Sequence, residues 1–372
     1  MLTAAGADQS FMRLALKEAR KGVGRTSPNP CVGAVVVREQ KVIATGYHHQ
    51  AGTPHAEIHA LRQAGDAARG ATLYVTLEPC NHIGRTPPCT RAIVAAGISR
   101  VVVGMEDPNP LVEGRGNAYL QEQGLELTCG VLEAECRALN RPFIKYITQG
   151  LPWVVMKAAI SLDGRISYQP HQGGPITGPA SRHKGHQLRN CLDAILVGNA
   201  TVMADDPSLT TRLPHGRGRD PVRVIMDTYL HIPPSARLLS LTSLAPTWIF
   251  CSKDVSLEKI KRLSQTDKVV IHQVACGRDG RVDLVEMLKI LAREGVLSLL
   301  VEGGATIHGA FLTQQLVDHV NLFMAPIFAG SSGTAVVAGL NIKNYEDAIR
   351  LQNVHYCRLG QDIMVEGDVL YP

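Results

Sequence analysis

Three side chains that could hold one zinc ion lie in two short stretches of this chain. His55 stands in the first stretch, and Cys80 and Cys89 stand in the second. Imidazole nitrogen and thiolate sulfur are preferred zinc ligands, and three protein ligands leave the fourth position open for water. We expect His55 and Cys89 to lie near the starts of two helices, so the fold must bring two loop-to-helix junctions together.

A carboxylate lies close to these ligands in the sequence but is not itself a predicted ligand. It belongs to Glu57, which follows His55 by two residues. Zinc lowers the pKa of a bound water to about 7, and a nearby carboxylate can move protons from that water to a leaving amino group. Zinc deaminases combine His-x-Glu with Pro-Cys-x-x-Cys in this way. Here eight residues, not two, separate Cys80 from Cys89. We predict His55, Cys80 and Cys89 as zinc ligands and Glu57 as the catalytic acid and base.

The other cysteines and a neighbouring histidine have simpler interpretations. His59 does not complete a zinc-protease motif, because that motif needs Glu directly after the first His. Nine cysteines, an odd and scattered number, do not favour a disulfide framework, so we expect a reducing cytoplasm. The cysteines without ligand spacing are interpreted as structural thiols, namely Cys31, Cys129, Cys136, Cys191, Cys251, Cys276 and Cys357.

Length and composition favour two globular domains that act on a small molecule. The chain has 372 residues, of which 45% are hydrophobic, enough for two cores. No run of about 18 apolar residues occurs, so we expect no membrane span. Residues 11–21 mix charged and apolar side chains and do not resemble a signal peptide. A net charge of +5 is too small to indicate nucleic-acid binding.

Hydrophobic periodicity predicts alternating strands and helices on both sides of a linker near Gly150 and Pro152. The linker divides the chain into predicted domains 1–148 and 149–372. In the first domain we predict helices from Asp8 or Ser10 to Lys21, over 55–63 and over 88–96, a β-hairpin of 31–37 with 41–47, and strands 71–77 and 100–104. In the second domain the strand candidates are 193–198, 222–226 and 297–301.

The second domain contains a strand that runs into a glycine turn and a helix. Backbone amides at Gly303 and Gly304, together with the helix start, could approach a phosphate. The Rossmann fingerprint is absent. Arginines between 212 and 223 would by default belong to a solvated loop, but their guanidinium groups also suit a small phosphorylated substrate. Polar residues at 161–165 and 204–207 are typical of turns, and spacing alone leaves open whether they belong to a site.

Taken together, these motifs resemble the RibD family of bifunctional riboflavin-biosynthesis enzymes over nearly the whole chain. The reductase half is matched at 161–165, 204–207 and 301–304. That family also has the eight-residue gap between the two cysteines. The deaminase half is matched by Asn-Pro-Cys-Val-Gly (29–33), Pro-His-Ala-Glu (54–57), Thr-Leu-Glu-Pro-Cys (76–80), Gly-Arg-Thr-Pro-Pro-Cys (84–89) and Asp-Pro-Asn-Pro (107–110).

The resemblance implies a cytidine-deaminase-like α/β/α domain of three layers followed by a dihydrofolate-reductase-like α/β domain. It implies zinc-dependent deamination of 2,5-diamino-6-(5-phosphoribosylamino)pyrimidin-4(3H)-one. NADPH-dependent reduction of the ribosyl chain of 5-amino-6-(5-phosphoribosylamino)uracil to ribityl would follow. The expected cofactors are one zinc ion and NADPH, and the expected partner is a small phosphorylated pyrimidine. We also expect a homo-oligomer, with a dimer favoured.

The resemblance also implies contacts in the reductase half. Where relatives often have Ser-x-Trp-Ile-Thr, this chain has Gly-Gly-Pro-Ile-Thr at 173–177, so it lacks a serine that could hold the substrate and a tryptophan that could pack on the cofactor. The implied substrate contacts are Gly173, Arg189, Leu209, Arg212 and Glu302. The implied NADPH contacts are Ala159, Pro175, Thr201, Asp205, Thr228, Gly304, Ala305, Thr306, Ile307, His308, Gly309 and Ala310.

Two other classes of protein remain open from the residues alone. A tRNA or nucleoside deaminase would share His-Ala-Glu, but it would usually have Cys-x-x-Cys and no second domain. A degenerate deaminase could keep zinc only as a structural module, but Glu57 is not needed for such a role. Ammonia release from free pyrimidines compared with RNA discriminates between the catalytic alternatives.

Overall fold

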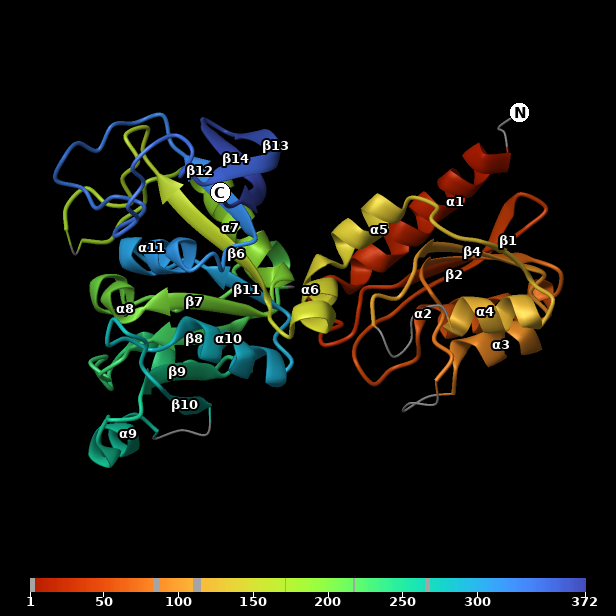
Figure 1. The fold of residues 1–372 in the computed structure, drawn as a ribbon, viewed down its shortest axis with the longest axis horizontal. Helices are drawn as coiled ribbons and strands as arrows, with labels where there is room; N and C mark the ends of the chain where they lie inside the picture. Colours follow the sequence, from red (N-terminus) through yellow and green to blue (C-terminus); the bar gives the residue numbers. More distant parts are fainter. Residues whose placement is uncertain (1–3, 83–86, 110–114, 171, 217, 265–267) are drawn as a thin grey trace. The chain divides into compact units, whose positions relative to one another are not determined.

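The computed structural model describes residues 4–82, 87–109, 115–170, 172–216, 218–264 and 268–372. The motif residues Gly84, Arg85, Thr86 and Pro110 lie outside these ranges. The chain divides into two compact units, Met1–Gly150 and Leu151–Pro372, whose ribbons are drawn in Figure 1. Within the described ranges, none of the helices combines the length and the apolar composition needed to cross a bilayer.

The described part of the first unit contains a five-stranded sheet in the order β2-β1-β3-β4-β5. Strand β1 pairs antiparallel with β2 and β3, whereas β3, β4 and β5 run parallel. The strands are β1 Gly33–Arg38, β2 Lys41–Tyr47, β3 Thr72–Leu77, β4 Arg100–Met105 and β5 Glu126–Thr128. The helices are α1 Ala4–Ala19, α2 Ala56–Ala64, α3 Cys89–Ala95, α4 Arg115–Glu122, α5 Glu133–Leu139 and α6 Arg141–Gln149, with short 3-10 turns at Arg20–Gly22 and Gly65–Ala68.

Two glycines let helices pack closely on opposite faces of this sheet. A Cβ at Gly33 would overlap the backbone of Ala15 in α1, and a Cβ at Gly46 would overlap the backbone of Ala56 in α2. Figure 1 shows α1 and α5 on one side of the sheet and α3 and α4 on the other. The unit therefore has three layers, and the predicted hairpin about residues 38–40 is confirmed.

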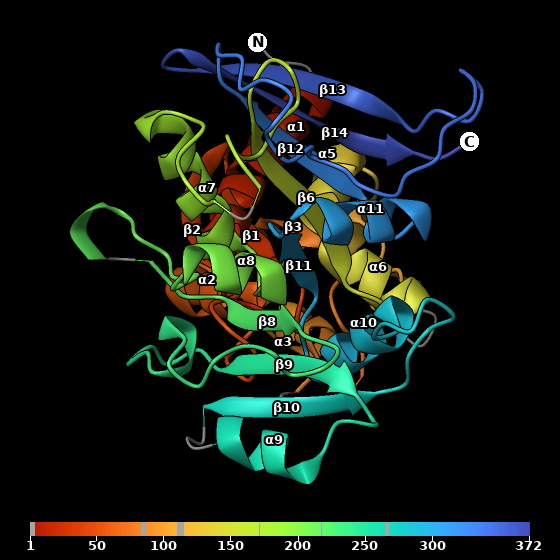
Figure 2. The ribbon, with the colours of Figure 1, turned by 90° about the vertical axis from the view of Figure 1, so that its left-hand side faces the viewer.

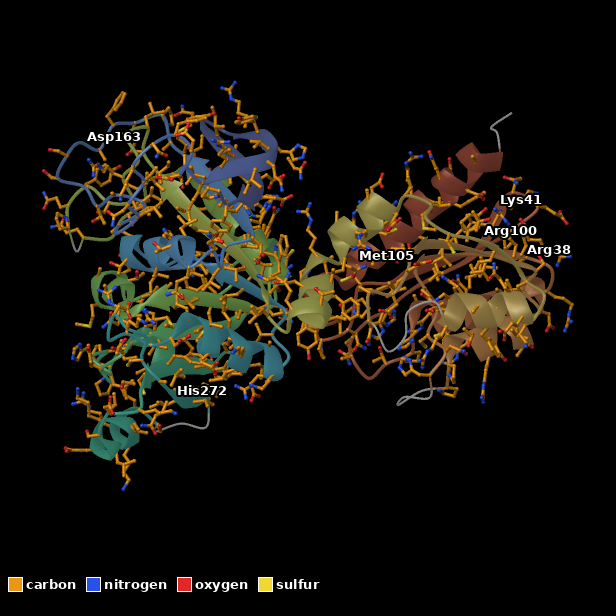
Figure 3. The ribbon with its side chains drawn as sticks, viewed as in Figure 1. Arg38, Lys41, Arg100, Met105, Asp163 and His272 are labelled. Carbon is orange, nitrogen blue, oxygen red and sulfur yellow. The ribbon has the colours of Figure 1, made fainter. Side chains whose placement is uncertain are left out.

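The predicted start of the first helix is wrong, because α1 begins at Ala4 and Asp8 lies inside it. Asp8 is only 7% exposed and accepts hydrogen bonds from Arg100 Nη1 at 3.0 Å, Arg100 Nη2 at 2.8 Å and Tyr74 Oη at 2.7 Å. Its carboxylate therefore joins α1 to β3 and β4, and it does not cap a helix. Arg100 is labelled on β4 in Figure 3.

The described part of the second unit contains a nine-stranded sheet in the order β10-β9-β8-β7-β11-β6-β12-β14-β13. From β10 across the sheet to β12, each strand pairs in parallel with its neighbour. At the edge beyond β12, strand β14 pairs antiparallel with both β12 and β13. Figure 2 shows β8, β9 and β10 side by side, with β13 and β14 at the opposite end. The strands are β6 Trp153–Ile160, β7 Ala194–Gly198, β8 Val222–Met226, β9 Thr247–Ser252, β10 Val269–Val274, β11 Ser298–Val301, β12 His319–Met324, β13 Arg350–Leu359 and β14 Asp362–Leu370.

Helices cover both faces of the parallel part of this sheet. Met287 of α10 and Phe311 of α11 belong to one buried cluster, and Val202 of α8 and Leu263 of α9 belong to the other. Successive strand residues alternate between the two clusters, as the period of a strand requires. The helices are α7 Pro179–Cys191, α8 Asn199–Asp205, α9 Leu257–Leu263, α10 Leu284–Arg293 and α11 Ala305–Thr313, with 3-10 turns at Pro214–Gly216 and Arg237–Leu239.

Asp8→Asn should destabilise the full-length chain by about 2 kcal/mol at pH 7, because it removes a charge that accepts three hydrogen bonds, one buried and two partly buried. The hydrogen bonds from Arg100 hold the pKa of Asp8 below its ordinary value. The stabilisation is therefore fully present above the unfolded-state pKa of about 3.9 and is lost as the pH falls through the lower folded-state pKa. Urea unfolding between pH 7 and pH 3 measures this difference.

The control for this experiment is Glu39→Gln. Glu39 pairs with Arg38 at 4.0 Å on an exposed turn, where an ion pair contributes little. Its unfolding midpoint should stay close to that of the unmodified chain. A difference between Asp8→Asn and the unmodified chain that persists unchanged to pH 3 would contradict the assigned role of Asp8.

Candidate functional sites

The predicted zinc ligands come together at the edge of the first sheet. His55 directly precedes α2 and makes no capping hydrogen bond with its side chain, Cys80 follows β3, and Cys89 is the first residue of α3. Their ligand atoms all lie within 4.8 Å of one another. His55 Nδ1 is 3.2 Å from Cys89 Sγ and 3.5 Å from Cys80 Sγ. Tetrahedral zinc would hold nitrogen and sulfur ligands about 3.5 Å apart.

Hydrogen bonds attach the Cys80 loop to the start of α3. The backbone N–H of Cys89 donates to Cys80 Sγ at 3.4 Å, and the N–H of Thr90 donates to the Cys80 carbonyl at 3.3 Å. Thr90 Oγ1 also donates to Asn81 Oδ1 at 2.7 Å. These bonds bring the two cysteines together although eight residues separate them.

The surroundings of Cys80 favour a thiolate. Its hydrogen bonds with the Cys89 thiol and with His55 lower the pKa of Cys80 to about 4, although burial opposes the shift. The hydrogen bond to Cys80 also raises the pKa of His55. The hydrogen bond with Cys80, together with burial, raises the pKa of Cys89. Cys80 is therefore the thiolate of the set, and His55 and Cys89 would release their protons when a metal binds. One imidazole and two sulfur ligands within 4.8 Å of one another fit zinc.

Glu57 lies in the first turn of α2 and is 3% exposed. Burial raises the pKa of its carboxyl group. Among the residues that the structure describes, none forms a hydrogen bond with Glu57 Oε2. A buried polar atom without a partner is costly and needs an explanation, and carboxyl groups perturbed in this way are common in active sites. Glu57 is therefore available for proton transfer beside the ligand set.

His48 supports the ring of His55 and was not predicted. The two rings meet edge to face with centroids 5.5 Å apart. His48 Nδ1 lies 3.2 Å from the Pro54 carbonyl, so this nitrogen must donate, and Nε2 can then accept from Asn29 Nδ2 at 3.0 Å. Burial lowers the pKa of His48, in agreement with a neutral ring. The only sequence signal is a histidine directly after a predicted strand.

Glu78 was also not predicted to have a role in the site, although it directly precedes Pro79-Cys80. One of its carboxylate oxygens accepts from the N–H groups of Gly116 and Asn117 at 3.0 and 3.1 Å. The other accepts from the N–H of Asp107 at 3.2 Å. Glu78 thereby ties the end of β3, and with it the Cys80 loop, to the residues after β4 and to α4.

The second unit contains a cavity of about 680 Å³ at the carboxyl ends of β7, β8 and β11. Gly304 has a φ of +81°, which favours glycine, and it directly precedes α11. The predicted substrate contact Gly173 also lines this cavity, where it packs against the Asp205 carboxylate so closely that an added Cβ would overlap it. The predicted NADPH contacts on its wall are Thr201, Asp205, Thr228, Gly304, Ala305, Thr306, Ile307 and Ala310.

A smaller cavity of about 230 Å³ adjoins the first, because Ile166 and Gly174 line both. Its wall includes the predicted NADPH contacts Ala159 and Pro175 and the predicted substrate contacts Arg189 and Arg212. The described lining of the two cavities does not include the other predicted contacts, Leu209, Glu302, His308 and Gly309. Leu209 is in the buried core, His308 Nδ1 lies 2.9 Å from the Val336 carbonyl, and Gly309 packs against the backbone of Ala338.

Arg189 is committed to Glu302. Its Nε and Nη2 donate to the two Glu302 oxygens at 2.9 and 2.8 Å, and its Nη1 donates to the Thr210 carbonyl at 3.1 Å. Burial alone would raise the pKa of Glu302, but the charges of Arg189 and then of Lys157 lower it to about 2. The guanidinium fork of Arg189 therefore positions a buried carboxylate, and Arg189 also lines the smaller cavity.

Two other side chains of the smaller cavity, a cation and a histidine, lie on the same face of α7 as Arg189. Arg182, His186 and Arg189 are spaced four and three residues apart and all line the cavity. Helical spacing was the signal that could have identified Arg182 and His186 from the sequence. Asp362 fixes the start of α7, because its carboxylate accepts from Gly178 N at 2.8 Å and from Ser181 Oγ at 2.5 Å.

The two polar clusters have different roles. Asp163, labelled in Figure 3, accepts from Ser161 Oγ at 2.5 Å and from the N–H groups of Ala329 and Gly330 at 2.9 and 2.8 Å, so it organises a turn. In the second cluster Asp205 lines the larger cavity, whereas Asp206 accepts from the N–H of Arg237 at 2.8 Å.

Two family models match the chain, one in each unit. The zinc-binding region of cytidine and deoxycytidylate deaminases matches residues 6–105. The RibD C-terminal domain matches residues 152–365. The first match contains all three predicted zinc ligands, and the second contains both cavities.

Relatives extend the similarity to the whole chain. A riboflavin biosynthesis protein RibD from Bacillus amyloliquefaciens is 42% identical over 98% of this chain and 99% of its own. The solved structure of RibD from Acinetobacter baumannii is 35% identical, with a TM-score of 0.88 over 98% of this chain and 99% of its own. That of a diaminohydroxyphosphoribosylaminopyrimidine deaminase/5-amino-6-(5-phosphoribosylamino)uracil reductase from Thermotoga maritima is also 35% identical, with a TM-score of 0.86 over the full length of both chains. The chain therefore belongs to the RibD family of riboflavin-biosynthesis enzymes, which combine a zinc-dependent deaminase with an NADPH-dependent reductase.

Proposed function

We propose that residues 1–148 deaminate 2,5-diamino-6-(5-phosphoribosylamino)pyrimidin-4(3H)-one and that residues 149–372 reduce the resulting 5-amino-6-(5-phosphoribosylamino)uracil. The name of the Thermotoga maritima relative supports both substrates. The observation that carries the proposal is the convergence of His55, Cys80 and Cys89 beside a buried carboxylate. Ammonia release from the diamino substrate, followed by NADPH oxidation on the product, tests it.

In the deaminase unit, His55, Cys80 and Cys89 would hold zinc, which when bound activates a water as nucleophile at neutral pH. Glu57 would accept a proton from that water and deliver it to the departing amino group. Its unpaired Oε2 leaves a site for this proton. Burial raises the pKa of Glu57, which brings its carboxyl group closer to the range in which it can both accept and return a proton.

In the reductase unit, the larger cavity would hold NADPH, which supplies the reducing electron pair. Gly303, Gly304 and the start of α11 offer backbone N–H groups to its diphosphate. The smaller cavity would hold the phosphoribosyl group. Arg212 and Arg182 line it with at least part of each guanidinium free, since each uses only Nη1 in its hydrogen bonds with the residues that the structure describes.

The proposed partners are a small phosphorylated pyrimidine and a second copy of this chain, with a dimer favoured. A reducing cytoplasm suits the cysteines, because all nine lie in described parts of the chain and each is a free thiol. Two of these cysteines would be zinc ligands, and oxidation of their thiolates would prevent them from binding zinc.

Cys80→Ala should lose zinc and deaminase activity together, because two ligands do not replace three. Reduction of the deaminated intermediate should continue, since both reductase cavities lie in the other unit. Metal analysis and separate assays of the two reactions measure this. Cys129→Ala, at an exposed thiol outside the ligand set, is the control and should keep its zinc. Full zinc occupancy in Cys80→Ala would show that the ligand set is wrong.

Glu57→Gln should keep zinc and fold but lose about 10²–10⁴-fold in deaminase kcat, because an amide cannot accept the proton. The measurement is steady-state ammonia release with zinc content determined on the same samples. Glu122→Gln, at an exposed position in α4, should behave like the unmodified enzyme. Turnover of Glu57→Gln close to that of the unmodified enzyme would remove Glu57 from the mechanism.

Arg212→Lys should weaken binding of the reductase substrate about tenfold and change NADPH binding little, because the charge stays but the fork is lost. Gly304→Val should do the reverse, since a side chain there would meet Thr201 Oγ1 and strain a backbone with positive φ. Separate titrations of both variants with substrate and NADPH test this. Weaker NADPH binding with unchanged substrate binding in Arg212→Lys would mean that the two subsites are inverted.

A further inference from the structure

The larger cavity runs across neighbouring strand ends in a definite order. At one end it meets the smaller cavity, where Ile166 and Gly174 line both. It then passes Gly304 after β11, Gly198 at the end of β7 and Thr228 just after β8. A dinucleotide that places its nicotinamide at the substrate and its diphosphate at the glycine turn must place its adenosine half beyond β7, near the end of β8.

Arg281 lies at that adenosine end. It is the only Lys or Arg on the described wall of the larger cavity. Its side chain is exposed, and none of the described residues forms an ion pair or a hydrogen bond with its guanidinium group. The guanidinium group of Arg281 is therefore available to a ligand in this cavity.

The backbone around Arg281 is held by a tight turn. The N–H of Gly277 donates to the Arg281 carbonyl at 2.7 Å, and the N–H of Arg281 donates to Asp279 Oδ1 at 3.1 Å. Val282 N donates to Thr228 Oγ1 at 3.4 Å, and Tyr229 Oη donates to the Gly280 carbonyl at 3.3 Å. These last two bonds attach the turn to the residues after β8, so Arg281 occupies a fixed place beside Thr228.

The carboxylate of Asp227, at the same strand end, is already occupied by hydrogen bonds within the fold. Asp227, which directly follows β8, is 1% exposed and accepts from Asn199 Nδ2 at 3.1 Å and from Ile232 N at 2.8 Å. In dinucleotide-binding folds a free acid near this point binds the ribose 2′-hydroxyl of NAD, whereas an arginine accommodates the 2′-phosphate of NADP. Here Asp227 is committed to the fold, and Asp279, which lines the same end of the cavity, accepts the N–H of Arg281 and helps to hold its turn. The guanidinium group of Arg281 remains free.

We propose that Arg281 binds the 2′-phosphate of the adenosine ribose and so determines the preference for NADPH over NADH. This inference rests on the proposed function, because it assumes that the larger cavity holds the nicotinamide cofactor. The planar guanidinium fork suits the phosphate oxygens. Thr228, beside it, can add a neutral hydrogen bond.

The test is calorimetric binding of NADP⁺ and NAD⁺ to the full-length enzyme and to Arg281→Met, which keeps an aliphatic side chain but removes the charge. We expect NADP⁺ to bind about 10- to 100-fold more weakly to the variant and NAD⁺ to bind as before. Arg281→Lys should recover part of the loss. The fragment adenosine 2′,5′-bisphosphate should follow NADP⁺, and ADP should follow NAD⁺.

Arg278→Met is the matched control, because Arg278 is exposed on the same turn and is not on the described cavity wall. It should bind both nucleotides like the unmodified enzyme. Equal weakening of NADP⁺ and NAD⁺ by Arg281→Met, or no weakening of either, overturns the inference and leaves the proposed function standing. Failure of the unmodified enzyme to bind any nicotinamide nucleotide overturns the proposed function itself.

Discussion

Parallel pairing of strands brings together the loops on which the chemistry of this chain depends. When neighbouring strands run in the same direction, their carboxyl ends meet at one edge of the sheet, and side chains distant in the sequence become neighbours. Strand β3 delivers Cys80 to such an edge in the first unit. Strands β11, β7 and β8 line up the glycine turn, α8 and Thr228 in the second unit. The predicted zinc site and the cavities of the second unit therefore both lie where the carboxyl ends of parallel strands meet.

Two buried carboxylates illustrate how surroundings divide roles between identical functional groups. Glu302 is buried beside Arg189 and Lys157, and these charges hold its pKa far below the ordinary value. The side chain of Glu57 is also buried but has an oxygen without a partner among the described residues, and burial raises its pKa. The first is a fixed negative charge that holds Arg189 and Lys157 on the wall of the smaller cavity. The second, under the proposed mechanism, changes its protonation state during the reaction.

The sequence was most informative where the chemistry is local or the residue types are rare. The grouping of His55, Cys80 and Cys89 could be predicted because few combinations of His, Glu and Cys serve any purpose other than a zinc site, and the structure brings their ligand atoms within 4.8 Å of one another. The sequence did not reveal that Arg189 pairs with Glu302, because 113 residues separate them and either could equally face a substrate. Asp8 was misread as a cap for the same reason, since its partner Arg100 is 92 residues away. Long-range pairs override local preference, and a single sequence carries no record of them.

The close contact between Gly173 and Asp205 has a consequence for how this chain can change. Gly173 stands where the Ser-x-Trp-Ile-Thr pattern of the resemblance has its serine, and an added Cβ here would overlap the Asp205 carboxylate, which stands on the wall of the same cavity. A serine at position 173 therefore requires the exposed side chain of Asp205 to rotate away, which changes the wall of the larger cavity. The residue at position 173 and the conformation of Asp205 are coupled, so the two must be considered together when either is substituted.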